Sequence, residues 1–193
     1  MPSNLLTIGH SNLPAEQFMA LLQGAGVTAL ADVRSVPFSR RFPWFSQKPL
    51  AERLRSAGIS YLALGDALGG RPKDPALYCD GVADYEAMAA TDEFRGGLDR
   101  AVAESRKSRL CLMCAEREPL DCHRCLLLAR ALSERGIVAG HILAGGIVES
   151  HTATEERLIA SGKGKPDLFA DRPTLLADAY RRRARAIAAR AKG

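Results

Sequence analysis

Residues 108–146 read SRLCLMCAEREPLDCHRCLLLARALSERGIVAGHILAGG. An apolar run of strand length at 108–116 is followed by an amphipathic helical pattern at 121–136 and a second strand-like run at 137–146. Strands that are apolar on both faces are typical of a parallel sheet covered by helices on either side. The stretch therefore predicts a β-α-β unit in an α/β protein.

The same alternation extends through the rest of the chain. Further strand-like runs cover 4–10, 27–35 and 59–65, and further helical patterns cover 13–26, 45–58, 82–107 and 175–193. The long pattern at 82–107 contains Gly96-Gly97, where we expect a break, and residues 161–174 read as a loop. We predict a three-layer sandwich with a mainly parallel, Rossmann-like sheet, plus a C-terminal helical extension. Residues 1–149 form the predicted α/β domain, and 150–193 a basic, partly helical extension.

Composition and length favour a chain that folds around a core. It has 193 residues, 47% hydrophobic and 25% charged, which excludes wholesale disorder. No apolar run approaches the roughly 20 residues that span a bilayer, so we expect no membrane partner. The N-terminus has no signal-peptide pattern. We therefore expect a cytoplasmic protein with reduced cysteines, whose odd number, five, also argues against a disulfide framework.

Basic charge is concentrated in the tail. Residues 157–193 carry a net charge of +7, whereas residues 1–156 carry −2, which together give the +5 of the chain. This distribution is typical of a tail that contacts nucleic acid, and equally of a solvated helix face. The net charge of the chain alone therefore selects no partner.

The cysteines resemble a zinc motif, because four of them form C-x2-C-x7-C-x2-C over residues 111–125. Cys111 and Cys114 lie three apart in a predicted strand, so their side chains should point to opposite faces. Cys125 fits the buried stripe of the next helix. We therefore reject a four-cysteine zinc site. Walker, G-x-G-x-x-G and C-x5-R motifs are absent, and we expect no cofactor and assign no metal ligand.

Polar residues follow the predicted strands, at the edge where parallel sheets bind ligands. The candidates for substrate binding are Ser11, Asp32, Arg34, Ser35, Arg40, Arg41, Gly70, Arg71, Arg117 and Arg124. The candidates for catalysis are His10, Glu116, Cys122 and His123. Arginines gathered at one edge repel each other unless an anion or carboxylates offset them. The alternative for an individual arginine is a helix cap or an ion pair with a carboxylate such as Asp32 or Glu116.

Cys122 is the candidate reactive thiol. We expect Asp121 to cap the helix that begins there, which would place Cys122, His123 and Arg124 in its first turn. The helix dipole and the adjacent arginine would lower the pKa of the thiol, and the same turn could bind a phosphate. The alternative is a small buried cysteine at a helix start. Cys114 is either part of the core or a wall of the site.

The motifs TIGHSN, DVRSVPFSRRFPWFS, LGGR and LMCAEREPLDCHR, in this order, resemble the domain-of-unknown-function 488 family. The resemblance runs from about residue 5 to His141 and Gly145-Gly146, and leaves the tail outside. It implies that the family's characteristic polar positions are His10, Ser11, Asp32, Arg34, Ser35, Arg40, Arg41, Gly70, Arg71, Cys114, Glu116, Cys122, His123 and Arg124. Cys111 and Cys125 match nothing in the family pattern. The family has no settled activity, so the resemblance supports a fold and a site but no reaction.

Our preferred hypothesis is an enzyme acting on an anionic, phosphate-bearing substrate, such as a nucleotide or nucleic acid. The arginines would hold the anion, His10 or His123 would move a proton, Cys122 would be the nucleophile or redox group, and Glu116 would orient a partner.

The alternative is a non-catalytic nucleic-acid-binding module that uses the basic tail and the aromatics of RRFPWF, residues 40–45. A thiol sensor pairing Cys122 with Cys114, and a metal held by His10, His123 and Glu116, also stay open. The oligomeric state is not predicted.

Overall fold

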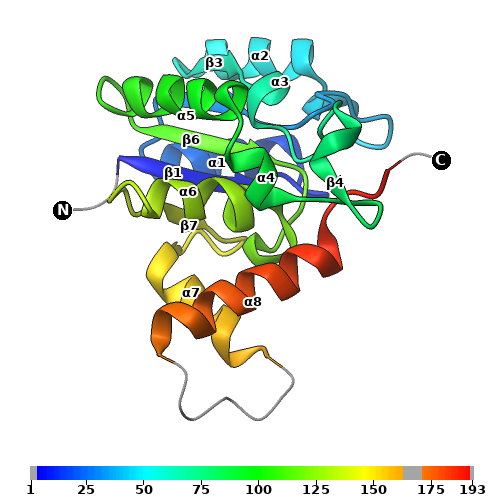
Figure 1. Cartoon of the computed structure of the whole chain (residues 1–193). Helices are drawn as coiled ribbons and strands as arrows, with labels where there is room; N and C mark the ends of the chain where they lie inside the picture. The colour runs from blue at the N-terminus through cyan, green and yellow to red at the C-terminus, as the bar shows by residue number, and fades with distance from the viewer. Residues whose placement is uncertain (1–3, 163–170, 192–193) are drawn as a thin grey trace.

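The computed structural model describes residues 4–162 and 171–191. A six-stranded sheet has the order β3-β2-β6-β1-β7-β8, and only β8 is antiparallel to its neighbour. The strands are β1 (Leu5–Gly9), β2 (Ala29–Asp32), β3 (Ser60–Ala63), β6 (Leu110–Cys114), β7 (Gly140–Ile142) and β8 (Val148–Ser150). Because β1, β2, β3, β6 and β7 are parallel, their carboxyl ends meet at one edge, as predicted (Figure 1).

Helices cover both faces of the sheet, which confirms the predicted α/β architecture with a mainly parallel sheet. One face packs against α1 (Ala15–Gly24) and α2 (Gln47–Ser56). The other face packs mainly against α3 (Gly65–Leu68), α4 (Tyr85–Ala89), α5 (Asp92–Ser105), the π-helical segment η4 (Arg124–Ala129) and α6 (Arg130–Ser133). Smaller elements are η1 (Pro43–Phe45), η2 (Pro75–Leu77), η3 (Pro119–Asp121) and the hairpin β4 (Tyr78–Cys79) and β5 (Val82–Ala83).

Side chains of β6 alternate between the two cores. Leu112 and Cys114 pack in the core beneath α5, whereas Cys111 and Met113 pack in the core beneath α1. The first C-x2-C pair therefore diverges, as the alternation of a strand requires. A single metal ion cannot contact all four cysteines of residues 111–125.

The helical region 82–107 is broken at Thr91, so the predicted break at Gly96-Gly97 is wrong. Thr91 Oγ1 accepts the N–H of Phe94 at 3.2 Å and caps α5. Gly97 lies inside α5, where a Cβ would approach Ala67 of α3 to 2.7 Å. This glycine therefore serves close packing of two helices and does not mark a helix end.

The C-terminal part contains α7 (His151–Ala160) and α8 (Arg172–Ile187), which lie together beyond the β7 side of the sheet (Figure 1). α8 buries Ala179 and Tyr180 against the body of the protein. After it, Ala189 accepts the N–H of Ala83 at 2.9 Å. Within the described ranges no helix is long and apolar enough to span a membrane. Most of the loop predicted at 161–174 lies outside the described residues.

Candidate functional site

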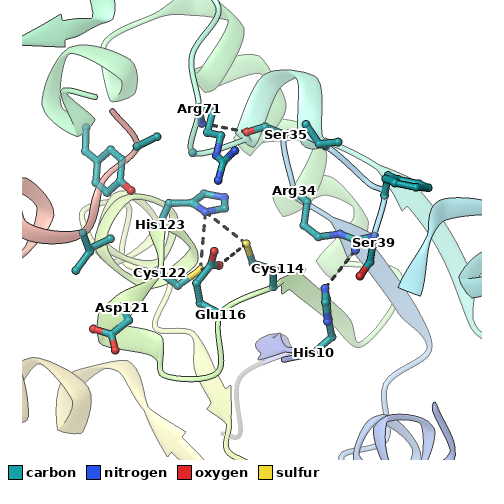
Figure 2. A pocket seen from close by; sticks show the side chains of 17 residues that line it. His10, Arg34, Ser35, Ser39, Arg71, Cys114, Glu116, Asp121, Cys122 and His123 are labelled. Carbon is teal, nitrogen blue, oxygen red and sulfur yellow. Dashed lines mark hydrogen bonds between the residues drawn. The ribbon is translucent and has the colours of Figure 1, made fainter. Parts of the chain in front are cut away.

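A pocket of about 420 Å³ opens at the carboxyl edge of the sheet, where the chain leaves β1, β2 and β6 (Figure 2). This volume suits a small-molecule ligand. Its polar or ionisable lining consists of His10, Arg34, Ser35, Ser39, Arg71, Tyr85, Cys114, Glu116, Asp121, Cys122 and His123. Val36 and Phe38, 60% and 66% exposed, form an apolar part of the rim with Ile187. The sheet topology thus brings segments from the whole chain to one cavity.

Two thiols, one carboxylate and one imidazole converge in this pocket (Figure 2). Cys114 Sγ and Cys122 Sγ lie 2.9 and 3.0 Å from the same oxygen, Oε2 of Glu116. His123 Nδ1 lies 3.6 Å from the sulfur of Cys114 and 3.8 Å from that of Cys122. We call these four residues the thiol cluster. Its four donor atoms all lie within 4.8 Å of one another.

The ring of His123 is oriented by the backbone. Its Nε2 lies 3.1 Å from the carbonyl oxygen of Val33, at the end of β2. A carbonyl can only accept, so Nε2 carries a proton and Nδ1 faces the sulfurs. Gly70 allows this arrangement, because a Cβ there would lie 2.7 Å from the ring. Gly70 therefore contributes space for His123.

Cys122, not Asp121, caps the helical segment that follows the loop. Its carbonyl accepts the N–H groups of Cys125 and Leu126 at 3.1 Å, and its Sγ lies 3.5 Å from the N–H of Arg124. Asp121 belongs to the preceding turn η3, and its carboxylate binds Arg183. The predicted Asp121 cap is wrong, because Pro119 starts a separate turn that leaves Cys122 extended.

The pKa values of the two thiols in the cluster are shifted in opposite directions. Burial alone would raise the pKa of Cys122, but a hydrogen bond with Cys114 and the charges of Arg124 and His123 hold it well below its usual value. The hydrogen bond with Cys122 and burial raise the pKa of Cys114. Burial opposes protonation of His123, yet the negative charge of Cys122 raises the pKa of its ring. Without a metal, these opposite shifts favour a thiolate at Cys122 beside a protonated His123.

Glu116 is the exposed member of the cluster, although its carboxyl faces two buried sulfurs. Desolvation, together with the charge of Cys122, raises the pKa of this carboxyl. Glu116 as a whole residue is thus exposed, while its carboxyl group is partly desolvated beside the two sulfurs. A group in this position can exchange protons between the sulfurs and the pocket.

Arg34, Asp32 and His10 form a buried wall beside the cluster. Arg34 binds both carboxylate oxygens of Asp32, at 2.9 and 2.6 Å, and lies 3.2 Å from His10 Nε2. His10 Nδ1 donates to the carbonyl of Ser11 at 2.9 Å, so Nε2 accepts from Arg34. Burial lowers the pKa of His10 to about 4. His10 is therefore neutral, and its lone pair is engaged by Arg34.

Arg124 supports the loop between β6 and η3. It is fully buried and donates to the carbonyls of Glu116 and Arg117 at 2.6 and 2.9 Å. Its Nε has no hydrogen-bond partner among the described residues. Arg124 therefore positions Glu116 from behind, at a place that a substrate in the pocket does not reach.

Of the fourteen residues predicted for the site, the structure brings eight to the pocket lining. These are His10, Arg34, Ser35, Gly70, Arg71, Glu116, Cys122 and His123. Asp32 and Arg124 lie buried behind the lining, and Ser11, Arg40, Arg41 and Arg117 do not line the pocket. Arg71 is exposed and forms no ion pair with any described residue, while its backbone N–H binds Ser35 Oγ at 3.0 Å.

Other lining residues were not among the fourteen predicted for the site. Cys114 packs in the core and also lines the cavity. The sequence had left open which of these two places it takes. Tyr85 of α4, and Ile187 and Ala189 at the end of the chain, also line the pocket. They arrive through tertiary packing, for which one sequence carries no local signal.

A second buried group joins Thr7, His141, His151, Tyr180 and Glu155. Successive polar atoms along this chain lie 2.7, 3.0, 2.8 and 3.0 Å apart. Cys125 Sγ lies 4.0 Å from His151 Nδ1. Because the hydrogen bonds occupy both nitrogens of each ring, we assign this group a structural role that ties α7 and α8 to the sheet.

Arginines of α8 bind carboxylates of the body. Arg181 pairs with Glu86, Arg183 with Asp121, and Arg185 lies 3.8 Å from Asp80. In the RRFPWF segment Phe45 is buried against the ring of His10, with centroids 4.2 Å apart. Much of the surface considered for nucleic-acid contact is thus engaged within the protein.

The fold and the site define an α/β protein with a mainly parallel sheet and a polar pocket at the carboxyl ends of its strands. The family model for Domain of unknown function DUF488 matches residues 14–131, more than half of the chain. The chain therefore belongs to this family, as its motifs indicated. No curated protein and no solved structure matches it.

Proposed function

We propose that this protein is an enzyme that acts on a small anionic, phosphate-bearing substrate, such as a nucleotide, in the pocket of the thiol cluster. One observation carries the proposal: the pocket is lined both by the thiol cluster and by Arg71, whose guanidinium has no ion-pair partner among the described residues. A guanidinium matches the oxygens of a phosphate with two parallel hydrogen bonds. The cavity volume favours a single small molecule over a duplex.

The residues take distinct roles in this proposal. Arg71 binds the anionic group, and the apolar rim formed by Val36 and Phe38 contacts an aromatic or apolar part of the substrate. Cys122 is the electron-rich centre of the cluster, and Glu116 and His123 exchange protons with it. The buried ion pair of Arg34 and Asp32 stabilises one wall of the pocket. His10 accepts a hydrogen bond from Arg34 and thereby helps to position its guanidinium.

Thermal unfolding with a panel of phosphate compounds and nucleotides tests the proposal. A ligand at 100 times its dissociation constant stabilises the native state by about 2.7 kcal/mol. For a chain of this size that raises the melting temperature by roughly 5 to 10 °C. Arg71→Ala should abolish the shift for a ligand that binds the unmodified protein.

Arg100→Ala is the matched control, because Arg100 is exposed on α5 and does not line the pocket. It should leave the ligand-induced shift unchanged. A shift that survives Arg71→Ala would place the anion elsewhere. If no anion of the panel stabilises the protein, the substrate class is wrong.

A further inference from the structure

We propose that Cys114, Glu116, Cys122 and His123 bind one Zn²⁺ ion. The inference departs from the sequence-based expectation that no metal ligand is present. The inference does not rest on the proposed function, because metal binding can be measured without any substrate. With four protein ligands the site is closed, as in a structural zinc site, so Cys122, Glu116 and His123 would take the roles proposed above only in the metal-free protein.

The geometry points to a common centre. In a tetrahedral site with ordinary Zn–S and Zn–N bonds, a sulfur and a nitrogen ligand are about 3.6 Å apart. His123 Nδ1 lies 3.6 and 3.8 Å from the two sulfurs. Once Nδ1 is deprotonated, its lone pair can bind an ion that lies between the nitrogen and the two sulfurs.

The carboxylate completes the set. Glu116 Oε2 is almost equidistant from both sulfurs, at 2.9 and 3.0 Å, and the four residues have donor atoms that all lie within 4.8 Å of one another. A ligand oxygen would sit about 3.5 Å from each sulfur in a tetrahedral site, so binding requires it to move outward by roughly half an ångström. Glu116 faces the pocket, where such a movement is open to it.

The outer contacts are those that a metal-binding histidine needs. His123 donates Nε2–H to the Val33 carbonyl, which fixes the tautomer with Nδ1 free. Arg124 holds the Glu116 backbone by a 2.6 Å hydrogen bond. Its buried positive charge also offsets the single negative charge left when two thiolates and a carboxylate bind a dication. Asp32 already neutralises Arg34, so the assembly is balanced.

The donor set selects the metal. Thiolate and imidazole ligands favour Zn²⁺, while Mg²⁺ and Ca²⁺ take oxygen ligands. The group of Cys125, His141 and His151 also has donor atoms within 4.8 Å of one another. There, however, the two rings are joined directly by a 3.0 Å hydrogen bond, and the remaining ring nitrogens bind Thr7 and Tyr180. Neither ring of that group therefore has a free lone pair for an ion.

The test is the zinc content of the full chain, purified without a polyhistidine tag, measured by plasma mass spectrometry. We expect close to one zinc per chain. Replacing zinc with Co²⁺ should give tetrahedral visible bands and a thiolate-to-cobalt charge-transfer band in the near ultraviolet. The cobalt spectrum uses the unmodified protein and therefore does not depend on a variant that folds.

Variants locate the site. Cys114→Ser and Cys122→Ser should each weaken zinc binding more than about 100-fold, since losing even an outer-shell contact costs 10- to 100-fold. Cys79→Ser, at an exposed cysteine outside both groups, is the matched control and should keep full zinc content. His151→Gln tests the second group and should also keep it.

Substoichiometric zinc after zinc loading, with no charge-transfer band in the cobalt protein, would overturn the inference. Zinc that is lost in His151→Gln but kept in Cys122→Ser would also overturn it, in favour of the second group. The two proposals fail separately. Full zinc without anion stabilisation refutes the substrate class and leaves the metal site standing, whereas anion binding that requires Arg71, in a protein that takes up no zinc when loaded, refutes only the metal.

Discussion

Lowering the pH should destabilise this protein through the buried histidines that link the sheet to α8. Tyr180 donates to Glu155 Oε1, so its oxygen accepts from His151 Nε2–H. His151 Nδ1 then accepts from His141, whose other nitrogen accepts from Thr7. The chain of hydrogen bonds is complete when both rings are neutral. A proton on His151 would place two N–H groups face to face across 3.0 Å.

The size of the effect follows from the pKa of His151, which burial lowers from 6.5 to about 4. Between these values the unfolded chain binds a proton that the folded chain does not, so the free energy of unfolding decreases as pH falls. At pH 5 the loss from this group is about 2 kcal/mol, and it approaches about 3 kcal/mol below pH 4.

Urea unfolding at pH 7.5 and pH 5.0, for the unmodified protein and His151→Gln, measures this effect. The glutamine can donate and accept hydrogen bonds but cannot titrate. Its free energy of unfolding should change between the two pH values by about 2 kcal/mol less than that of the unmodified protein. His10 has the same lowered pKa in both proteins, so its contribution cancels.

The competing possibility is a protonated His151 paired with Glu155, whose Oε1 lies 3.6 Å from His151 Nε2. That pair would raise the pKa of the ring, and stability would then increase as pH falls through 6.5. An equal pH dependence in both proteins, or a larger loss in His151→Gln, would refute the neutral chain.

Three further predictions concern the pocket and its surroundings. Asp32→Asn leaves the Arg34 guanidinium buried without its carboxylate and should cost about 3 kcal/mol of unfolding free energy, whereas Asp66→Asn at an exposed pair should cost under about 1 kcal/mol. Gly70→Ala should displace His123 and reduce zinc content severalfold in a folded protein, while Gly145→Ala, where a Cβ meets open space, should not. An oligonucleotide should stabilise the protein no more than the matching mononucleotide; a larger, steeply salt-dependent shift would instead favour the basic tail as a nucleic-acid surface.

The fold was predictable because its main signals are periodic and local. The apolar runs that became β1, β2 and β6 are buried throughout, and their pattern needs no knowledge of partners, whereas β3 lies at the edge of the sheet and is partly exposed. The break between α4 and α5 was not predictable from glycine content. Thr91 ends one helix and caps the next through its side chain, while Gly97 serves a contact with a residue thirty positions earlier.

The order of strands limited what the sequence could say about the site. The prediction of parallel strands indicated which residues meet at one edge, but it did not indicate that β6 lies between β1 and β2. This neighbourhood, invisible in one sequence, brings Val33 against His123 and makes the thiol cluster possible. The helix start was misjudged because a prolyl turn at 119–121 precedes it.

Arginines and cysteines differ in how far sequence position indicates their role. A guanidinium carries five donors on a long side chain, so Arg124 satisfies backbone carbonyls and Arg34 satisfies a carboxylate without meeting a ligand. A cysteine is short, so its sulfur stays close to its own backbone, and strand alternation settles its direction. That is why Cys111 could be excluded from the site and Cys114 could not. In our proposal, anion binding by the pocket therefore depends on Arg71, and its chemistry depends on two sulfurs that converge on one carboxylate oxygen.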